Sequence, residues 1–204
     1  MKTVHSETSE TYTEKGSKFI GYLHPTENLA AFGKFLDRVK SYHSDATHHC
    51  YAYRLDPINL QEFSQDDGEP SGTAGLPILN KLKSFDLINA TLIVVRYYGG
   101  TNLGKSGLIA AYGLAAEMCI NKADLATVVR TKNIKISYPY AQQNKIERLK
   151  SRFKLIELDA QYLADVTMTV GCSLSGADEC ISKLDSLEHL NINYQILGDD
   201  FVTR

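Results

Sequence analysis

SQDDGEPSGTAGLPIL (residues 64–79) and RYYGGTNLGKSGLIAAY (residues 96–112) together hold seven of the fourteen glycines in this chain of 204 residues. Glycine adds no side chain to a core and tolerates positive φ, so such clusters predict loops that need unusual backbone geometry or close backbone approach. The first stretch adds the carboxylates of Asp66, Asp67 and Glu69, and the second begins at Arg96 and contains Lys105. We expect these two glycine blocks, separated by one strand, to converge on a single surface.

Two motifs within the blocks carry a resemblance to a known family. They are Asp67-Gly-Glu-Pro-Ser-Gly-Thr-Ala-Gly75 and Arg96-Tyr-Tyr-Gly-Gly100, followed by Leu103-Gly104 and Gly107-Leu108. Together they resemble the signature of the IMPACT family, and the whole length is similar to its bacterial YigZ-like branch. The chain departs from the family pattern Gly-Gly-Leu-x-Arg-Ala-Tyr, because Ser106 and Ala110 replace its first glycine and its arginine. This departure weakens an anion-contacting role for the start of that helix.

The resemblance implies both a fold and a function. It implies an α+β, two-domain chain whose amino-terminal domain shares the fold of the second domain of a small-subunit ribosomal protein and whose carboxy-terminal domain is ferredoxin-like. Eukaryotic members are known as translation regulators that bind the activator of a stress-response kinase. The resemblance therefore implies a translation-linked binding or regulatory protein that contacts RNA, the ribosome or a translation-regulatory protein. No cofactor is expected, and an enzyme is the less favoured interpretation.

Composition limits the kinds of partner. The chain has 22 basic and 24 acidic residues and a formal net charge of −2, so it lacks the basic excess of a non-specific nucleic-acid binder. We expect no DNA binding and, for RNA, only a local patch. Neither an apolar leader nor a membrane-length apolar run is present, which favours the cytoplasm. The four cysteines (Cys50, Cys119, Cys172 and Cys180) are scattered without a C-x-x-C pair, which predicts buried free thiols.

The hydrophobic periodicity predicts the elements of the first domain, residues 1–130. Residues 11–23 alternate around Lys15-Gly16-Ser17-Lys18 and predict a hairpin or an edge strand pair. Residues 27–42 repeat apolar side chains at helical spacing. Residues 48–55 and 90–97 are rich in β-forming residues, and the second of these segments is apolar enough to be a central strand. Residues 108–121 predict a buried helix.

A second pattern begins where the apolar periodicity breaks, between Asp124 and Lys132. Within the second domain, residues 131–204, it predicts a strand at 133–138, a helix at 141–153, strands at 155–162 and 165–173, a helix at 176–187 and a strand at 191–197. This β-α-β-β-α-β order is ferredoxin-like. We place the domain boundary near Val129 and expect an exposed linker there.

Our preferred hypothesis for the glycine blocks is a recognition surface. Donor groups and exposed tyrosine rings around flexible loops suit single-stranded RNA or a protein surface. Residue types alone favour an ordinary sheet with solvated cations, and it is the resemblance that favours recognition. The candidate binding residues are Lys18, Arg54, Asp67, Glu69, Ser71, Thr73, Arg96, Tyr97, Tyr98, Gly99, Gly100 and Lys105.

The alternative is a phosphate-handling or metal-assisted enzyme. Residues 99–106, GGTNLGKS, match the letters of a P-loop, and the turn with Asp66, Asp67 and Glu69 could bind Mg²⁺ beside a phosphate. Such an enzyme requires those carboxylates within reach of the Gly99–Ser106 loop. A serine or threonine nucleophile is disfavoured, because the chain has no Gly-x-Ser-x-Gly motif.

Two further groups of residues have weaker functional interpretations. His43, His48, His49 and Cys50 are close in sequence, but only His48 and Cys50 would share a strand face, so we expect no metal site. The helix at 145–154, KIERLKSRFK, carries five cations and one glutamate. It is a second candidate for contact with ribosomal RNA, although such a charge run is commonly only a solvated face.

Overall fold

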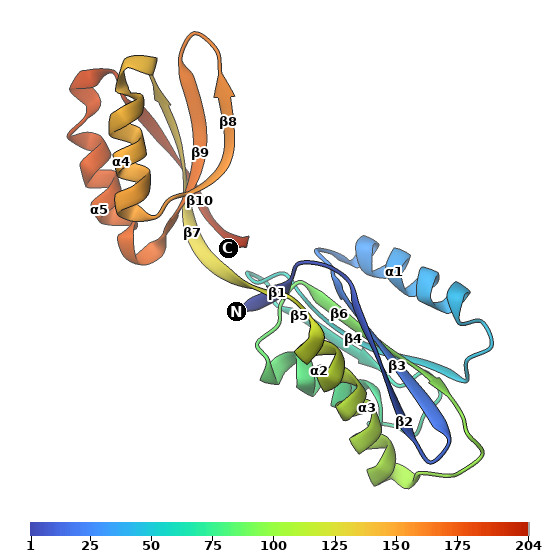
Figure 1. Cartoon of the computed structure of the whole chain (residues 1–204). Coiled ribbons are helices and arrows are strands. Elements are labelled where there is room, and N and C mark those ends of the chain that lie inside the picture. Colours follow the sequence, from blue (N-terminus) through green and yellow to red (C-terminus); the bar gives the residue numbers. More distant parts are fainter. Residues whose placement is uncertain (204) are drawn as a thin grey trace. The chain divides into compact units, whose positions relative to one another are not determined.

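The computed structural model describes residues 1–203, in which five α-helices and ten strands form two compact units (Figure 1). Unit 1 is Met1–Thr127, and unit 2 begins at Val128. Each unit has its own sheet and its own buried apolar cluster. The predicted α+β class and two-domain organisation are confirmed.

The sheet of unit 1 is antiparallel. Its strand order is β2 (Thr8–Glu14), β3 (Ser17–Pro25), β6 (Ala90–Tyr97), β4 (His48–Leu55) and β5 (Gln61–Gln65). The predicted hairpin is confirmed, with Lys15 and Gly16 both at positive φ in its turn. β6 is central, as its apolar run predicts, and is buried along nearly its whole length. β5 was not predicted, because its side chains are mostly polar.

Helices cover both faces of this sheet. On one face, α1 (Leu29–Tyr42) packs Phe35 and Val39 against the strands. On the other face lie α2 (Gly75–Ser84) and α3 (Gly104–Lys122), which enclose the largest apolar cluster. The sequence missed α2 and started the third helix at Leu108. The structure starts it at Gly104, so the end of the second glycine block is the first helical turn.

The predicted linker between Asp124 and Lys132 is wrong. These residues belong mainly to β7, a continuous strand from Leu125 to Tyr138. In unit 1, residues 125–127 pair with β1 (Lys2–Val4). Polar residues at the exposed positions of β7 interrupt the apolar pattern without interrupting the strand, because side chains alternate between the two faces.

Unit 2 has the predicted ferredoxin-like order. After residues 128–138 of β7 come α4 (Gln143–Phe153), β8 (Ile156–Tyr162), β9 (Val166–Ser173), α5 (Leu174–Asp185) and β10 (Asn193–Thr203), with 3₁₀ turns at Tyr140–Gln142 and Glu188–Leu190. The sheet is antiparallel in the order β10, β7, β9, β8. Among residues 1–203, no helix has the length and apolar character needed to cross a membrane.

Candidate functional site

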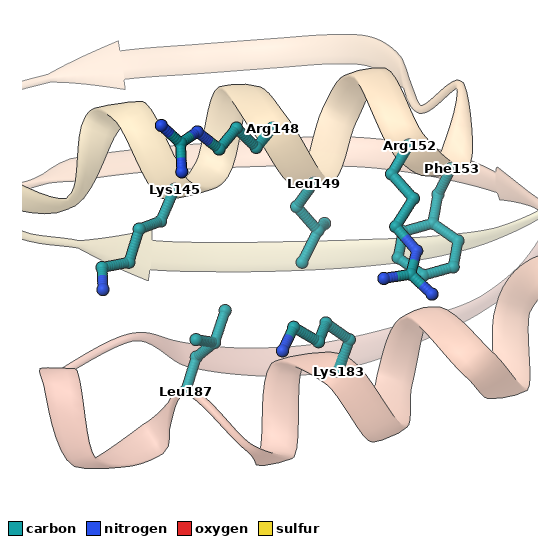
Figure 2. A pocket seen from close by; sticks show the side chains of 7 residues that line it. All are labelled: Lys145, Arg148, Leu149, Arg152, Phe153, Lys183 and Leu187. Atoms are coloured by element: carbon teal, nitrogen blue, oxygen red, sulfur yellow. The ribbon is translucent and has the colours of Figure 1, made fainter.

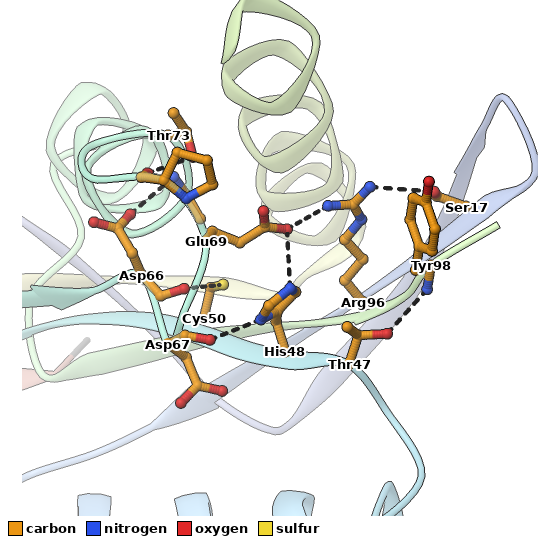
Figure 3. A network of polar contacts seen from close by, with 12 residues as sticks. Ser17, Thr47, His48, Cys50, Asp66, Asp67, Glu69, Thr73, Arg96 and Tyr98 are labelled. Atoms are coloured by element: carbon orange, nitrogen blue, oxygen red, sulfur yellow. Dashed lines mark hydrogen bonds and ion pairs between the residues drawn. The ribbon is translucent and has the colours of Figure 1, made fainter. Parts of the chain in front are cut away.

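A buried ion pair joins the two glycine blocks (Figure 3). Arg96, near the end of β6, places Nη1 2.5 Å from Oε1 of Glu69, and the two residues are only 5% and 8% exposed. The Tyr112 hydroxyl of α3 donates a hydrogen bond to the same carboxylate oxygen over 2.8 Å. The other Arg96 amino group lies 3.4 Å from Oγ of Ser17. The pair therefore connects the first block, β6, α3 and the start of β3.

Cys50 extends this network into the core. Its thiol lies 3.0 Å from the backbone oxygen of Asp66 and 3.3 Å from the hydroxyl of Tyr112. Burial raises the pKa of the Cys50 thiol and of the Tyr112 hydroxyl well above their ordinary values, so both groups stay protonated at neutral pH. A protonated, fully buried thiol is a structural donor and a poor nucleophile.

Asp66 organises the first block through its carboxylate. The carboxylate accepts hydrogen bonds from the backbone amides of Gly72, Ala74 and Gly75, which lead into α2. Burial by itself would raise the pKa of Asp66, but these hydrogen bonds outweigh that effect and hold the pKa below its ordinary value. The Asp66 carboxylate therefore caps the amino-terminal end of α2, although it lies eight and nine residues before the amides that it binds there.

Asp67 and His48 fasten the turn of the first block to β4. The Asp67 carboxylate accepts a 2.7 Å hydrogen bond from the backbone amide of His49, while its carbonyl lies 2.7 Å from Nδ1 of His48. The carboxylates of Asp66, Asp67 and Glu69 are thus each bound by donors of the protein itself. Within residues 1–203, no three His, Cys, Asp or Glu side chains are grouped closely enough to bind a metal ion.

The second block approaches the β2–β3 turn as closely as two backbones allow. The amide of Gly99 donates to Oγ of Ser17 over 3.1 Å. A Cβ atom on Gly99 would lie 1.9 Å from the carbonyl carbon of Gly16, which no side chain can accommodate. Close backbone approach is therefore why this position needs glycine, as the glycine content predicted.

An exposed segment, which we name the Tyr98–Lys105 loop, follows this contact. Tyr98 is 52% exposed, its ring centroid lies 5.4 Å from the Arg96 guanidinium carbon, and its amide donates to the Thr47 hydroxyl. Residues 99–102 are exposed, and α3 then begins at Gly104, whose backbone amide donates to Oδ1 of Asn102 over 2.9 Å. Lys105 is exposed in the first turn of that helix. The segment offers a fixed aromatic ring, open backbone and one cation.

Lys18 and Tyr97 lie on the opposite face of the sheet from Arg96. They are paired in register across β3 and β6, and the Tyr97 hydroxyl lies 2.8 Å from Nδ1 of the buried His43. The expectation that Tyr97 is exposed is wrong, because successive residues of a strand point to opposite faces and α1 covers this one. Of the two predicted stacking rings, only that of Tyr98 is open.

The remaining predicted residues are separated from the loop or serve local structure. Arg54 pairs with Ala90 at the far end of β6 and is buried against the Glu62 carboxylate and the carbonyl of Leu87. The hydroxyl of Thr73 is buried and donates to the carbonyl of Pro70. Ser71 is exposed in the turn between Pro70 and Thr73.

The sequence interpretation missed Tyr112, which contacts the Glu69 carboxylate. The sequence did point to it, since Tyr112 is the last residue of the second glycine block. Ser106 and Ala110, where the family pattern has glycine and arginine, are both exposed on α3. These replacements therefore alter the surface of α3 and leave the buried network intact.

Comparison with known proteins agrees with the architecture of two α+β units. The model of the Impact N-terminal domain matches residues 15–120, and that of a domain of unknown function, DUF1949, matches residues 136–187. The chain belongs to the IMPACT family. An IMPACT family member of Haemophilus influenzae is 32% identical over 185 residues, 90% of each chain. The family member YigZ of Escherichia coli is 33% identical over 172 residues, 83% of this chain and 84% of that one.

A solved structure shares the arrangement of the fold. The crystal structure of a hypothetical protein is 29% identical to this chain, covers 95% of both chains and superposes with a TM-score of 0.63. The similarity therefore extends over both units.

Proposed function

We propose that this chain is a translation-linked binding factor of the cytoplasm that contacts RNA of the translation machinery through its Tyr98–Lys105 loop. Membership of the IMPACT family supports the link to translation, which the resemblance of the two motifs implies. Eukaryotic proteins named IMPACT also match the chain, over less than half of its length. The finer claim of RNA contact rests on the geometry of the loop.

The exposed ring of Tyr98 is the observation that carries this proposal. The guanidinium of Arg96 lies against the ring, and the hydroxyl of Thr47 accepts a hydrogen bond from the backbone amide of Tyr98. The position of the ring is therefore supported before any ligand binds. A nucleobase stacked on an aromatic side chain contributes about 1–3 kcal/mol to binding. Holding the ring in place lowers the entropy that binding must otherwise remove.

The backbone beside the ring suits a phosphate group. Gly100 is exposed with no atom packed against it, and the first turn of α3 carries the positive end of the helix dipole, although the amide of Gly104 already donates to Oδ1 of Asn102. Lys105 adds an exposed positive charge in the same turn. A patch this small agrees with a chain of net charge −2, which has no general affinity for polyanions.

The enzyme alternative receives less support from the same geometry. Glu69 is tied to Arg96 and Tyr112, and Asp66 and Asp67 are engaged by backbone amides. Binding Mg²⁺ would require these carboxylates to give up those partners. Glu69 could do so only by leaving the positive charge of Arg96 buried without compensation.

Two binding assays test the proposal on the full chain. Fluorescence anisotropy with a labelled oligouridine of about 12 nucleotides measures RNA affinity, and co-sedimentation measures ribosome association. The Tyr98→Ala/Lys105→Ala variant should bind RNA about tenfold or more weakly. The matched control Tyr42→Ala/Lys34→Ala removes an exposed ring and an exposed cation from α1 on the other face, and should bind like the unmodified chain.

Three outcomes would separate the possibilities. Equal RNA affinity of the loop variant and the control would reject this loop as the RNA surface. Ribosome association that survives in the absence of any oligouridine binding would point to a protein partner. Turnover of a phosphate ester that depends on both Mg²⁺ and Asp67 would favour the enzyme alternative.

A further inference from the structure

A groove with apolar walls and a basic rim lies between α4 and α5 of unit 2 (Figure 2). Its rim carries four cations and its floor three apolar side chains, namely Lys145, Arg148, Arg152, Lys183, Leu149, Phe153 and Leu187. Its volume is about 270 Å³. Sites that enclose a whole small molecule usually have about 300–1,000 Å³, so this groove suits side chains presented by a larger partner.

The charges of this rim are largely uncompensated. Among residues 1–203, Lys145, Arg148 and Lys183 have no carboxylate within ion-pair distance, and Arg152 contacts only Glu179. The Arg152–Glu179 pair is well exposed on both sides, and such a pair contributes about 0–1 kcal/mol. A carboxylate from a partner can therefore replace that of Glu179 at small cost.

The structure also divides the basic helix predicted at residues 145–154. Lys150 is engaged by the carboxylates of Glu147 and Glu157, so it does not contribute to the rim. The α4 cations on the rim recur at i, i+3 and i+7, the spacing of one helical face. The cations of α4 on the rim, Lys145, Arg148 and Arg152, thus form a single row beside the apolar floor of the groove.

This combination favours a peptide over RNA. A sugar-phosphate backbone would leave the apolar surface of Leu149 and Leu187 without a matching partner. Base stacking would need an open aromatic face, but the ring of Phe153 is partly buried and packs against the apolar cluster of unit 2. An amphipathic helix matches both features, because it can place apolar side chains on the floor and carboxylates opposite the cations.

We propose that the α4–α5 groove docks an acidic amphipathic helix of a partner protein. The partner's carboxylates would recur at i, i+3 and i+7 to meet the row on α4, with apolar side chains between them. This site is on unit 2 and is separate from the Tyr98–Lys105 loop of unit 1. It therefore holds or fails independently of the function proposed for that loop.

The test uses the full chain and a labelled peptide of about 14 residues, or four helical turns. Its glutamates follow the i, i+3, i+7 spacing with leucines between them, and a second peptide replaces every glutamate by glutamine. The groove variant is Arg148→Glu/Lys183→Glu. The matched control is Lys34→Glu/Lys135→Glu, which changes net charge equally at exposed positions outside the groove.

We expect the acidic peptide to bind the unmodified chain and the control alike, and the groove variant about tenfold or more weakly, with a marked loss at high salt. The glutamine peptide should bind weakly to all three. Nuclear magnetic resonance should place the perturbed amides at Leu149, Phe153 and Leu187. Absence of peptide binding, equal binding by the groove variant, or perturbation confined to other residues would overturn the proposal. So would a groove that binds oligouridine in place of the peptide.

Discussion

Arg96 and Glu69, 27 residues apart in sequence, form an ion pair of 2.5 Å that is almost completely buried. The Nε atom of Arg96 is buried as well and has no hydrogen-bond partner among the described residues. The carboxylate of Glu69 is therefore the main compensation for taking the guanidinium charge out of water. Arg96, a candidate binding residue from sequence, is 5% exposed; it joins the two blocks through Glu69 and lies against the ring of Tyr98.

The first prediction concerns this pair. Arg96→Met should lower the free energy of unfolding by about 3–5 kcal/mol, because the charge of Glu69 would be left buried without its guanidinium partner. The double variant Glu69→Leu/Arg96→Met removes both charges and should recover most of that loss. Urea denaturation followed by circular dichroism measures both effects. A double variant no more stable than Arg96→Met would show that the pair is not what holds the site.

The second prediction concerns the contact between Gly99 and Gly16. Gly99→Ala should lower the free energy of unfolding by about 1–3 kcal/mol or more, because the new Cβ atom would overlap the Gly16 carbonyl. Gly33→Ala is the control: Gly33 lies within α1, and a Cβ there meets no atom within 4 Å. That change should stabilise the chain by up to about 1 kcal/mol. Urea midpoints that shift in the same direction for both variants would contradict this account.

The fold could be predicted where burial leaves a local pattern. The apolar run of β6 and the alternation of unit 2 are such patterns. The start of α2 has no such local pattern. Its N-cap residue is Ala74, which has no capping side chain, and the carboxylate that binds its amides belongs to Asp66, eight residues earlier. Residues 125–130 mislead for a related reason, since their strand partners are β1 and β10, which lie near the two ends of the described chain.

The candidate site could be located from sequence, but its faces could not be assigned. Both glycine blocks were identified, and the ion pair brings them together. Helices cover both faces of the sheet, so neither side of β6 is marked by an exposed, polar pattern. For that reason Arg96, Tyr97 and Tyr98 looked equivalent in sequence, whereas one is buried, one faces α1 and one is exposed.

The third prediction is a loss of stability in mild acid through His43. Burial lowers its pKa below the ordinary 6.5, and the charges of His49 and Lys18 lower it further. The ring nitrogens lie 2.7 Å and 2.8 Å from the hydroxyls of Tyr22 and Tyr97. Because the unfolded chain takes up this proton more readily than the folded chain, the stabilisation is complete above pH 6.5 and is lost as the pH falls from there toward the lower folded pKa.

The matching measurement compares urea midpoints at about pH 7.5 and about pH 5.5. His43→Gln keeps one donor and one acceptor but cannot be protonated, so its midpoint should fall less between the two pH values than that of the unmodified chain. An equal fall for His43→Gln and the unmodified chain would exclude His43 as a source of the effect.

The last prediction concerns the division of the chain within β7. We propose that Met1–Thr127 and the segment from Val128 to the carboxy terminus fold separately, because each has its own apolar cluster and its own strand partners. Residues 125–127 pair with β1, whereas residues 128–130 pair with residues 201–203 of β10.

The cut expected from sequence, after residue 130, would remove three paired residues from the second sheet. Thermal unfolding by circular dichroism should therefore give a lower midpoint for a fragment starting at residue 131 than for one starting at 128, and a lower midpoint for 1–124 than for 1–127. If the fragment from 128 is unfolded, or if the fragment from 131 is the more stable, the boundary proposed from the structure is wrong.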